Sequence, residues 1–185
     1  MLETPWDPFP ELKTDRLLLR KMTNDDLEDF FLLRSDQRIM QYIDRPLHKT
    51  IEETRQMIQS IDQLYESREG INWGITLKDN PKLIGTIGYY RMKKEYFRVE
   101  IGYLLHPDHW RKGIMSEAIQ AVTDYGFAKM KAHTIIADIN PDNTASRMIL
   151  EKNGFVKEAH FKDSYYINGR FEDAAIYTLF APTQE

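Results

Sequence analysis

Apolar residues recur along the chain with two different periods, which predict a mixture of helices and strands. Between residues 50 and 68 they follow roughly helical spacing, and Thr50 and Glu53 stand at the spacing of a capping box where that helix would begin. The segments 71–77 and 82–92 are short and apolar, and the turn sequence KDNP lies between them. This pattern predicts two successive strands.

The other predicted elements alternate along the chain in the same way. Helices are expected over residues 23–35, 114–130 and 144–155, and strands over 16–20, 97–106, 133–139 and on both sides of Asn168-Gly169, a strong hairpin signal. Gly154 is placed to end the last helix. Because no linker sequence divides the chain, we expect one mixed α/β domain over residues 1–185, with a largely meandering sheet and an extended N-terminal arm over residues 1–11.

The composition narrows the class of protein. The chain of 185 residues is 42% hydrophobic and 29% charged, as soluble globular proteins are. Its net charge of −4 argues against nucleic acid as a partner. It has no apolar run long enough to span a membrane and no leader-like start, so we expect no membrane partner and a cytoplasmic location. The absence of cysteine excludes thiolate zinc sites and a cysteine acyl-enzyme.

The stretch HPDHWRKGIMSEA, residues 106–118, holds the most distinctive chemistry of the chain. His106 and His109 are three residues apart, but Pro107 makes a helical pair of metal ligands improbable and no third histidine lies nearby. We therefore expect structural or solvated histidines and no metal.

The same stretch is also a candidate anion site. A predicted strand ends near Leu105, and a predicted helix opens at Gly113. Helix N-termini carry unpaired amides and roughly half a positive charge, so Arg111 and Lys112 are unfavourable there by about 0.3–1 kcal/mol each unless an anion is bound. The spacing matches neither a Walker loop nor GxGxxG. The alternative is a glycine that merely opens the helix.

Several segments in the same order carry a family resemblance. HPDHWRKGIMSEA and the later INPDNTASRMILEKNGF resemble the GNAT superfamily of acetyl-CoA-dependent N-acetyltransferases, and most closely its branch named for ribosomal-protein N-terminal acetyltransferases (RimJ/RimL). LKTDRLLLRKMTNDD, LIGTIGYY, VEIGYLL and the ending Gly169…Asp173…Tyr177 extend the likeness over nearly the whole chain. It implies a mixed, mostly antiparallel sheet flanked by helices, splayed between its fourth and fifth strands to hold acetyl-CoA as co-substrate.

The resemblance also implies roles for individual residues. The backbone of Tyr103, Leu104 and Leu105 and the side chain of Asn143 would bind the pantetheine arm. The diphosphate would lie on the amides of Arg111, Lys112, Gly113, Ile114, Met115 and Ser116. The family loop usually reads Arg/Gln-x-x-Gly-x-Gly/Ala, whereas Trp110 and Met115 occupy its first and last positions here.

The implied reaction is direct attack of an amine on the thioester in a ternary complex. Deprotonating a lysine-like amine at pH 7 costs about 4.6 kcal/mol, but an α-amine costs only about 1 kcal/mol. Glu100 is the candidate general base; alternatively it is a sheet-face carboxylate paired with Arg98, Lys93 or Lys94. Ser146 is the candidate proton donor to the leaving thiolate, and its alternative is a structural place in the first helical turn.

These residues predict an N-acetyltransferase that acts on a peptide N-terminal α-amine or on a small-molecule amine. One alternative is a non-catalytic CoA-binding regulatory domain, which would keep the anion site but lack turnover. Another is a self-association module in which the C-terminal hairpin pairs between chains. For the acetyltransferase itself, the candidate partners are the acceptor amine and a second copy of the chain in a homodimer.

Overall fold

One sheet of eight strands organises the protein in the computed structural model, which describes residues 1–167 and 169–182. The strands are β1 Leu12–Lys13, β2 Leu17–Arg20, β3 Ile71–Leu77, β4 Asn80–Lys93, β5 Arg98–Leu105, β6 Thr134–Ile139, β7 Val156–Ile167 and β8 Arg170–Phe180. They lie in the order β1-β2-β3-β4-β5-β6-β8-β7, and every neighbouring pair is antiparallel except β5 and β6. The predicted mixed, mostly antiparallel fold is confirmed.

The helices agree with the predicted ones except near the N-terminus. They are α1 Leu27–Ser35, α2 Gln37–Met40, α3 Ile51–Glu66, α4 Ile114–Ala128 and α5 Thr144–Lys152. The capping box of Thr50 and Glu53 is present at the start of α3. The segment expected as one helix from residue 23 begins as a 3₁₀ turn, Asn24–Asp26, capped by Thr23. The sequence pattern did not predict α2, whose four residues are too few to show a period.

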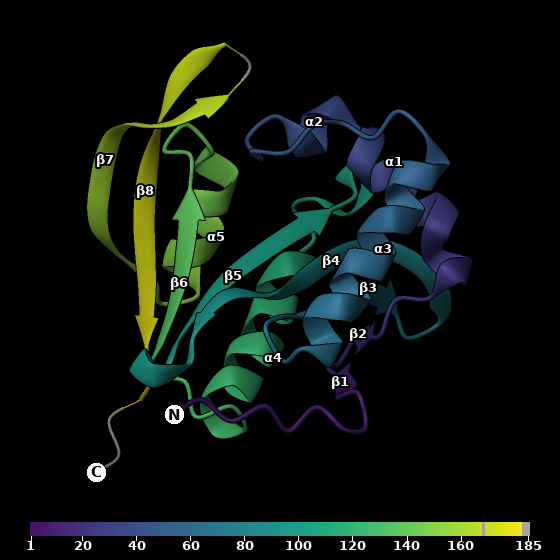
Figure 1. The fold of residues 1–185 in the computed structure, drawn as a ribbon, viewed down its shortest axis with the longest axis horizontal. Coiled ribbons are helices and arrows are strands. Elements are labelled where there is room, and N and C mark those ends of the chain that lie inside the picture. The colour runs from purple at the N-terminus through teal and green to yellow at the C-terminus, as the bar shows by residue number, and fades with distance from the viewer. Residues whose placement is uncertain (168, 183–185) are drawn as a thin grey trace.

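The helices cover both faces of the sheet (Figure 1). On one face, Leu83 and Leu104 pack with apolar residues of α1 and α3, among them Phe30 and Ile58. On the other face, the apolar side chains of β3, β4 and β5 pack against α4, and Leu150 of α5 joins the same core. We call these the α1/α3 face and the α4/α5 face.

The sheet opens between β5 and β6. Only three residue pairs join these strands, the last being Glu100 with Ile136. Beyond that point β5 continues with β4 as far as Leu105, while β6 continues with β8 as far as Ile139 (Figure 1). The opening was predicted between the fourth and fifth strands, and it lies between the fifth and sixth because the two-residue β1 is counted here as a strand. The predicted splay is confirmed.

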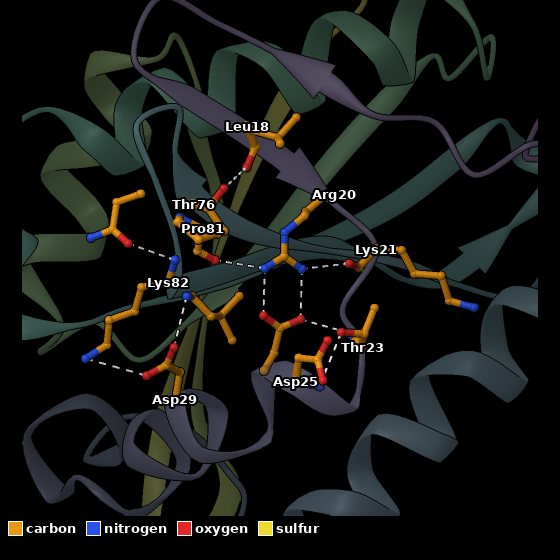
Figure 2. Close-up of polar contacts among 12 residues, drawn as sticks. Leu18, Arg20, Lys21, Thr23, Asp25, Asp29, Thr76, Pro81 and Lys82 are labelled. Atoms are coloured by element: carbon orange, nitrogen blue, oxygen red, sulfur yellow. Dashed lines mark hydrogen bonds and ion pairs between the residues drawn. The ribbon is translucent and has the colours of Figure 1, made fainter.

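A buried ion pair anchors the start of α1 to the sheet. The guanidinium of Arg20, on β2, donates to both carboxylate oxygens of Asp26 at 2.6 and 2.8 Å and to the carbonyls of Lys21 and Pro81 (Figure 2). Asp26 is only 3% exposed and also accepts a hydrogen bond from the amide of Thr23. A buried carboxylate is costly without such partners, so this network fixes where α1 lies on the sheet.

The N-terminal segment lies against the body of the protein. Its Leu2 and Glu3 amides donate to the carbonyls of Lys94 and Met130, and the side chain of Trp6 is fully buried. The indole of Trp73 donates to the carbonyl of Pro10 at 2.6 Å. The grouping of residues 1–185 into one domain with an arm over 1–11 stays a prediction.

The C-terminal hairpin forms as the Asn-Gly signal predicted. Ile167 pairs with Arg170, and Gly169 has a positive φ of 85°; Asn168 lies outside the described residues. The pattern did not reveal that β8 returns between β6 and β7. Strand order depends on long-range pairing, which local periodicity does not carry.

A close approach at Gly126 holds α4 against β4. A Cβ added at Gly126 would lie 2.4 Å from the hydroxyl oxygen of Tyr89, which donates to the carbonyl of Val122. We expect Gly126→Ala to destabilise the fold by about 1–3 kcal/mol through overpacking. In a Tyr89→Phe background the same change should cost less, because the clashing oxygen is gone. Denaturant unfolding of the four proteins of this cycle would measure the coupling, and strictly additive effects would contradict the packing argument.

Candidate active site

The loop from β5 to α4 presents a row of backbone amides. After a 3₁₀ turn at Pro107–His109, Arg111 and Gly113 both adopt left-handed backbone conformations, with φ of 59° and 75°. Glycine adopts this conformation without steric cost, whereas arginine does so at a cost of roughly 1–2 kcal/mol. The backbone is therefore held in a strained shape where α4 begins.

None of the amides of residues 111–116 donates a hydrogen bond to any residue that the structure describes. The first helical amide with a partner is that of Glu117, which donates to the carbonyl of Gly113 at 3.1 Å. Gly113 is the N-cap of α4 and has no side chain to cap the helix. Six amides, the positive end of α4 and the exposed Arg111 and Lys112 thus form an environment suited to an anion. We call residues 111–116 the anion cradle.

The splayed part of β5 also has open backbone groups. The amide of His106 donates to the carbonyl of Ile84, so the alternation of an antiparallel ladder directs the backbone groups of Leu104 toward β4. Those of Tyr103 and Leu105, and the carbonyl of Ile101, point the other way, into the gap that β6 has left, whereas the Ile101 amide still belongs to the last β5–β6 pair, Glu100 with Ile136. The carbonyl of Leu105 is occupied, because the indole of Trp110 donates to it at 2.8 Å. That bond gives a structural reason for a tryptophan at position 110.

The side chains of Tyr103 and Ser146 meet across the gap. Their hydroxyl oxygens are 2.6 Å apart, and both side chains lie on the α4/α5 face. Burial raises the pKa of Tyr103 to about 12, although the hydrogen bond with Ser146 lowers it. Asn143 is the N-cap of α5, and its Oδ1 accepts a hydrogen bond from the amide of Ser146 at 3.0 Å. Ser146 is therefore held at both its amide and its hydroxyl.

The start of α4 borders an open groove of about 580 Å³. Its walls come from residues 13–16, from the Gly113–Asp124 side of α4, and from Lys152 and Asn153 at the end of α5. The hydroxyl of Ser116 is paired with the side chain of Asn153, whereas Ile114 and Met115 bury their side chains in the core. At these three positions of the anion cradle, the backbone amides rather than the side chains are therefore available to an anion.

Glu100 lies on the α1/α3 face at the point where the sheet opens. Its carboxylate accepts from Nη1 of Arg91 at 3.0 and 3.3 Å, so its partner is none of the three cations considered from the sequence. Burial raises the pKa of Glu100; the Arg91 charge opposes this rise and the Asp138 charge adds to it. A hollow of about 150 Å³ lies beside this carboxylate.

The two candidate catalytic side chains thus approach the gap from opposite faces. Successive residues of a strand alternate between faces, so Glu100 and Tyr103 lie on different sides of β5. A group threaded between β5 and β6 would have a carboxylate on one side and the paired hydroxyls of Tyr103 and Ser146 on the other. This geometry suits transfer between two bound molecules.

Comparison with known proteins now identifies the fold. Residues 16–156 match the family model described as "Acetyltransferase (GNAT) domain". The chain is 39% identical over 176 residues to the uncharacterized N-acetyltransferase YoaA of Bacillus subtilis, covering 95% of this chain and 99% of that protein. The chain belongs to the GNAT acetyltransferase family. It is an acetyltransferase, as the sequence predicted.

Other relatives of this acetyltransferase have assigned acceptors. It is 26% identical to the spermidine N(1)-acetyltransferase of Vibrio cholerae (85% of this chain, 89% of that protein) and 27% identical to the ribosomal-protein-serine acetyltransferase of Escherichia coli (72% and 73%). Among solved structures, a GNAT acetyltransferase from Bacillus anthracis has a TM-score of 0.82 at 32% identity, covering 92% of this chain and 98% of that one. The ribosomal acetyltransferase RimL, solved with CoA, has a TM-score of 0.85 at 21% identity and covers 93% and 98%.

The described part of this acetyltransferase brings together no group of three or more histidine, aspartate or glutamate side chains that could bind a metal. His106 instead caps the 3₁₀ turn, where its Nδ1 accepts from the amide of Asp108. None of the described helices is both long enough and apolar enough to cross a bilayer. The cytoplasmic location and the homodimer stay predictions.

Three residues of the site were missed by the sequence reasoning. Arg16 contacts the anion cradle from the loop between β1 and β2, Arg91 pairs with Glu100 from a bulge in β4, and Ile101 adds an open carbonyl to the gap. Arg16 was visible within LKTDRLLLR as part of the resemblance, but its partner is about a hundred residues away. No local signal pointed to the other two.

The pairing of Glu100 with Arg91 predicts how the carboxylate titrates. Replacing Arg91 by Met should raise the pKa of Glu100 further, because Arg91 stabilises the ionised form. Arg98→Met is the matched control. Arg98 lines the same hollow, but it makes no ion pair with Glu100. Carboxyl-carbon NMR titration would follow the change, and an unaltered Glu100 pKa in Arg91→Met would refute the assignment.

Proposed function

We propose that this acetyltransferase uses acetyl-CoA as its co-substrate and acetylates the α-amine of a peptide or a small primary amine. The observation that carries this proposal is the run of six amides without partners, among the described residues, beside a sheet opened between β5 and β6. A diphosphate is the anion that such a site suits, and CoA carries one next to a pantetheine arm long enough to reach the gap.

The open backbone suggests the course of the pantetheine arm. The amides of the arm would hydrogen-bond with the carbonyl of Ile101 and with the backbone groups of Tyr103, in place of the missing neighbour strand. Asn143 has its Oδ1 engaged by the amide of Ser146, which leaves the Nδ2 group to donate to the arm. Leu104 would contribute less, because its backbone groups point toward β4. Leu105 keeps its amide available while its carbonyl binds Trp110.

The acceptor amine would approach from the α1/α3 face, where Glu100 lies. A carboxylate whose pKa is raised by burial is a stronger base than an exposed one, and its position at the vertex of the splay suits the removal of a proton from the amine. An α-amine needs about 1 kcal/mol for deprotonation at pH 7, so a water relayed to Glu100 would suffice. The spermidine and ribosomal-protein relatives illustrate both acceptor classes.

Ser146 would assist departure of CoA from the opposite face. When the carbon–sulfur bond breaks, the CoA sulfur becomes a thiolate, and the Ser146 hydroxyl can donate a hydrogen bond to it. The Tyr103 hydroxyl, kept protonated by its high pKa, can donate in turn to the Oγ of Ser146. Together the two hydroxyls would stabilise the leaving thiolate, and Ser146 would supply the proton that converts it to the thiol.

Gly113 provides a test of the anion cradle with a matched pair of variants. Gly113→Asp should weaken CoA binding at least tenfold, because it places a carboxylate against the diphosphate and about 1.4 kcal/mol is a factor of ten. Gly113→Asn has the same shape and also tolerates a left-handed backbone, but it adds no charge. Isothermal titration with CoA measures both. Equal affinities for the Asp and Asn variants would show that the diphosphate lies elsewhere.

Thiol release from acetyl-CoA tests turnover and the base. Glu100→Gln should lower kcat by about 10²–10⁴-fold on a lysine-like amine and by much less on a peptide α-amine, because only the first requires a committed base. Arg98→Gln serves as a control at the same hollow. Tight CoA binding with no acetylation of any amine in a broad panel would favour the regulatory-domain alternative. An equal loss on both amines would count against Glu100 as the base.

A further inference from the structure

Arg16 connects the start of the chain to the anion cradle through a set of directed hydrogen bonds. Its Nη1 donates to the carbonyl of Lys112 at 2.8 Å, and its Nε donates to Oε2 of Glu117 at 2.7 Å. Its own backbone amide donates to Oε1 of Glu117 at 2.9 Å, and the hydroxyl of Thr14 donates to the same oxygen at 2.5 Å. One arginine thus spans the loop before α4 and the first turn of that helix.

The bond to Lys112 has a consequence for the neighbouring amide. In a trans peptide unit the C=O and the following N–H point in opposite directions. When Arg16 holds the carbonyl of Lys112 on its own side, the N–H of Gly113 must face the other way, away from Arg16. A Cβ at Gly113 would be 3.4 Å from Nη2 of Arg16, which is ordinary van der Waals contact, so the guanidinium lies against this part of the loop.

The bonds from Arg16 to Glu117 reduce the repulsion between that carboxylate and an anion at the start of α4. Glu117 lies in the first turn of α4, where its charge would repel an anion bound at the helix N-terminus. Thr14 and both the backbone and the side chain of Arg16 surround this carboxylate with donors. Burial opposes ionisation of Glu117, but these donors lower its pKa overall. The carboxylate is thus neutralised by a cation fixed beside it.

We propose that Arg16 is a positioning residue for the co-substrate: it orients the Lys112–Gly113 peptide unit toward the diphosphate of CoA and neutralises Glu117. This inference rests on the proposed function, since it assumes that the diphosphate lies on the anion cradle. Arg16 acts here through the backbone of the loop. It therefore governs binding of the co-substrate rather than the chemistry at the thioester.

Lysine and glutamine variants separate geometry from charge. A lysine keeps the positive charge but cannot bond to the Lys112 carbonyl and to Glu117 with the planar fork of arginine. We expect both Arg16→Lys and Arg16→Gln to weaken CoA binding about tenfold or more and to raise the KM for acetyl-CoA, with kcat at saturation changed less than threefold. Arg55→Gln is the control, because it removes a similarly exposed arginine that also pairs with a carboxylate, on α3 and away from the cradle.

Isothermal titration with CoA and thiol-release kinetics would be measured on each folded variant, with folding checked by circular dichroism. Weakened binding in both Arg16 variants, with Arg55→Gln near the wild type, supports the inference. Wild-type affinity in Arg16→Gln overturns it, and so does full rescue by lysine, which would show that charge alone matters. If Arg16→Gln does not fold, Thr14→Val replaces it in the test. This change removes one hydrogen-bond donor to Glu117 and should weaken CoA binding; unchanged affinity would overturn the inference. A wild-type protein that does not bind CoA at all would instead refute the proposed function, and this inference with it.

Discussion

The loss of pairing between β5 and β6 is the constraint on which the rest of the site depends. A strand that loses its neighbour inside a protein leaves backbone groups that must find other partners. Here β5 ends its pairing with β6 at Glu100, and the carbonyl of Ile101 and the backbone groups of Tyr103 face the gap. The chain then leaves β5 through a strained turn and enters α4 with six further amides that have no partner among the described residues. Backbone polarity, rather than any one side chain, makes this region suited to a long ligand that carries both amides and a diphosphate.

The two faces of the sheet carry the two groups of candidate catalytic side chains. Glu100 lies on the α1/α3 face and is held by Arg91, whereas Ser146 and Tyr103 meet on the α4/α5 face. In the proposed mechanism, the amine would lose a proton on one face while the thiolate is stabilised on the other, so the carboxylate would not repel the leaving group. Relatives named as a spermidine acetyltransferase and a ribosomal-protein-serine acetyltransferase represent the two acceptor classes of the proposal.

Most elements and the location of the anion cradle could be predicted from the sequence, because both depend on local signals. Thr50 and Glu53 marked the start of α3, the apolar segment 71–77 proved to be β3, and Gly113 marked the opening of α4. Contacts between distant segments could not be predicted. The partner of Glu100 proved to be Arg91, which reaches it from a bulge in β4, and Trp110 proved to bond to a carbonyl at the end of β5. The roles assigned to Glu100, Ser146 and Asn143 stay proposals.

The sequence by itself determined the family, the mixed α/β class, the order of most elements and the residues that open α4, because period, capping and glycine placement act over a few neighbouring residues. Only the tertiary structure decided that β8 returns between β6 and β7, that Tyr103 and Ser146 share a hydrogen bond, and that Arg16 holds the loop before α4. These features join residues up to about a hundred positions apart. Their geometry follows from how the sheet and helices pack together, which no local pattern encodes.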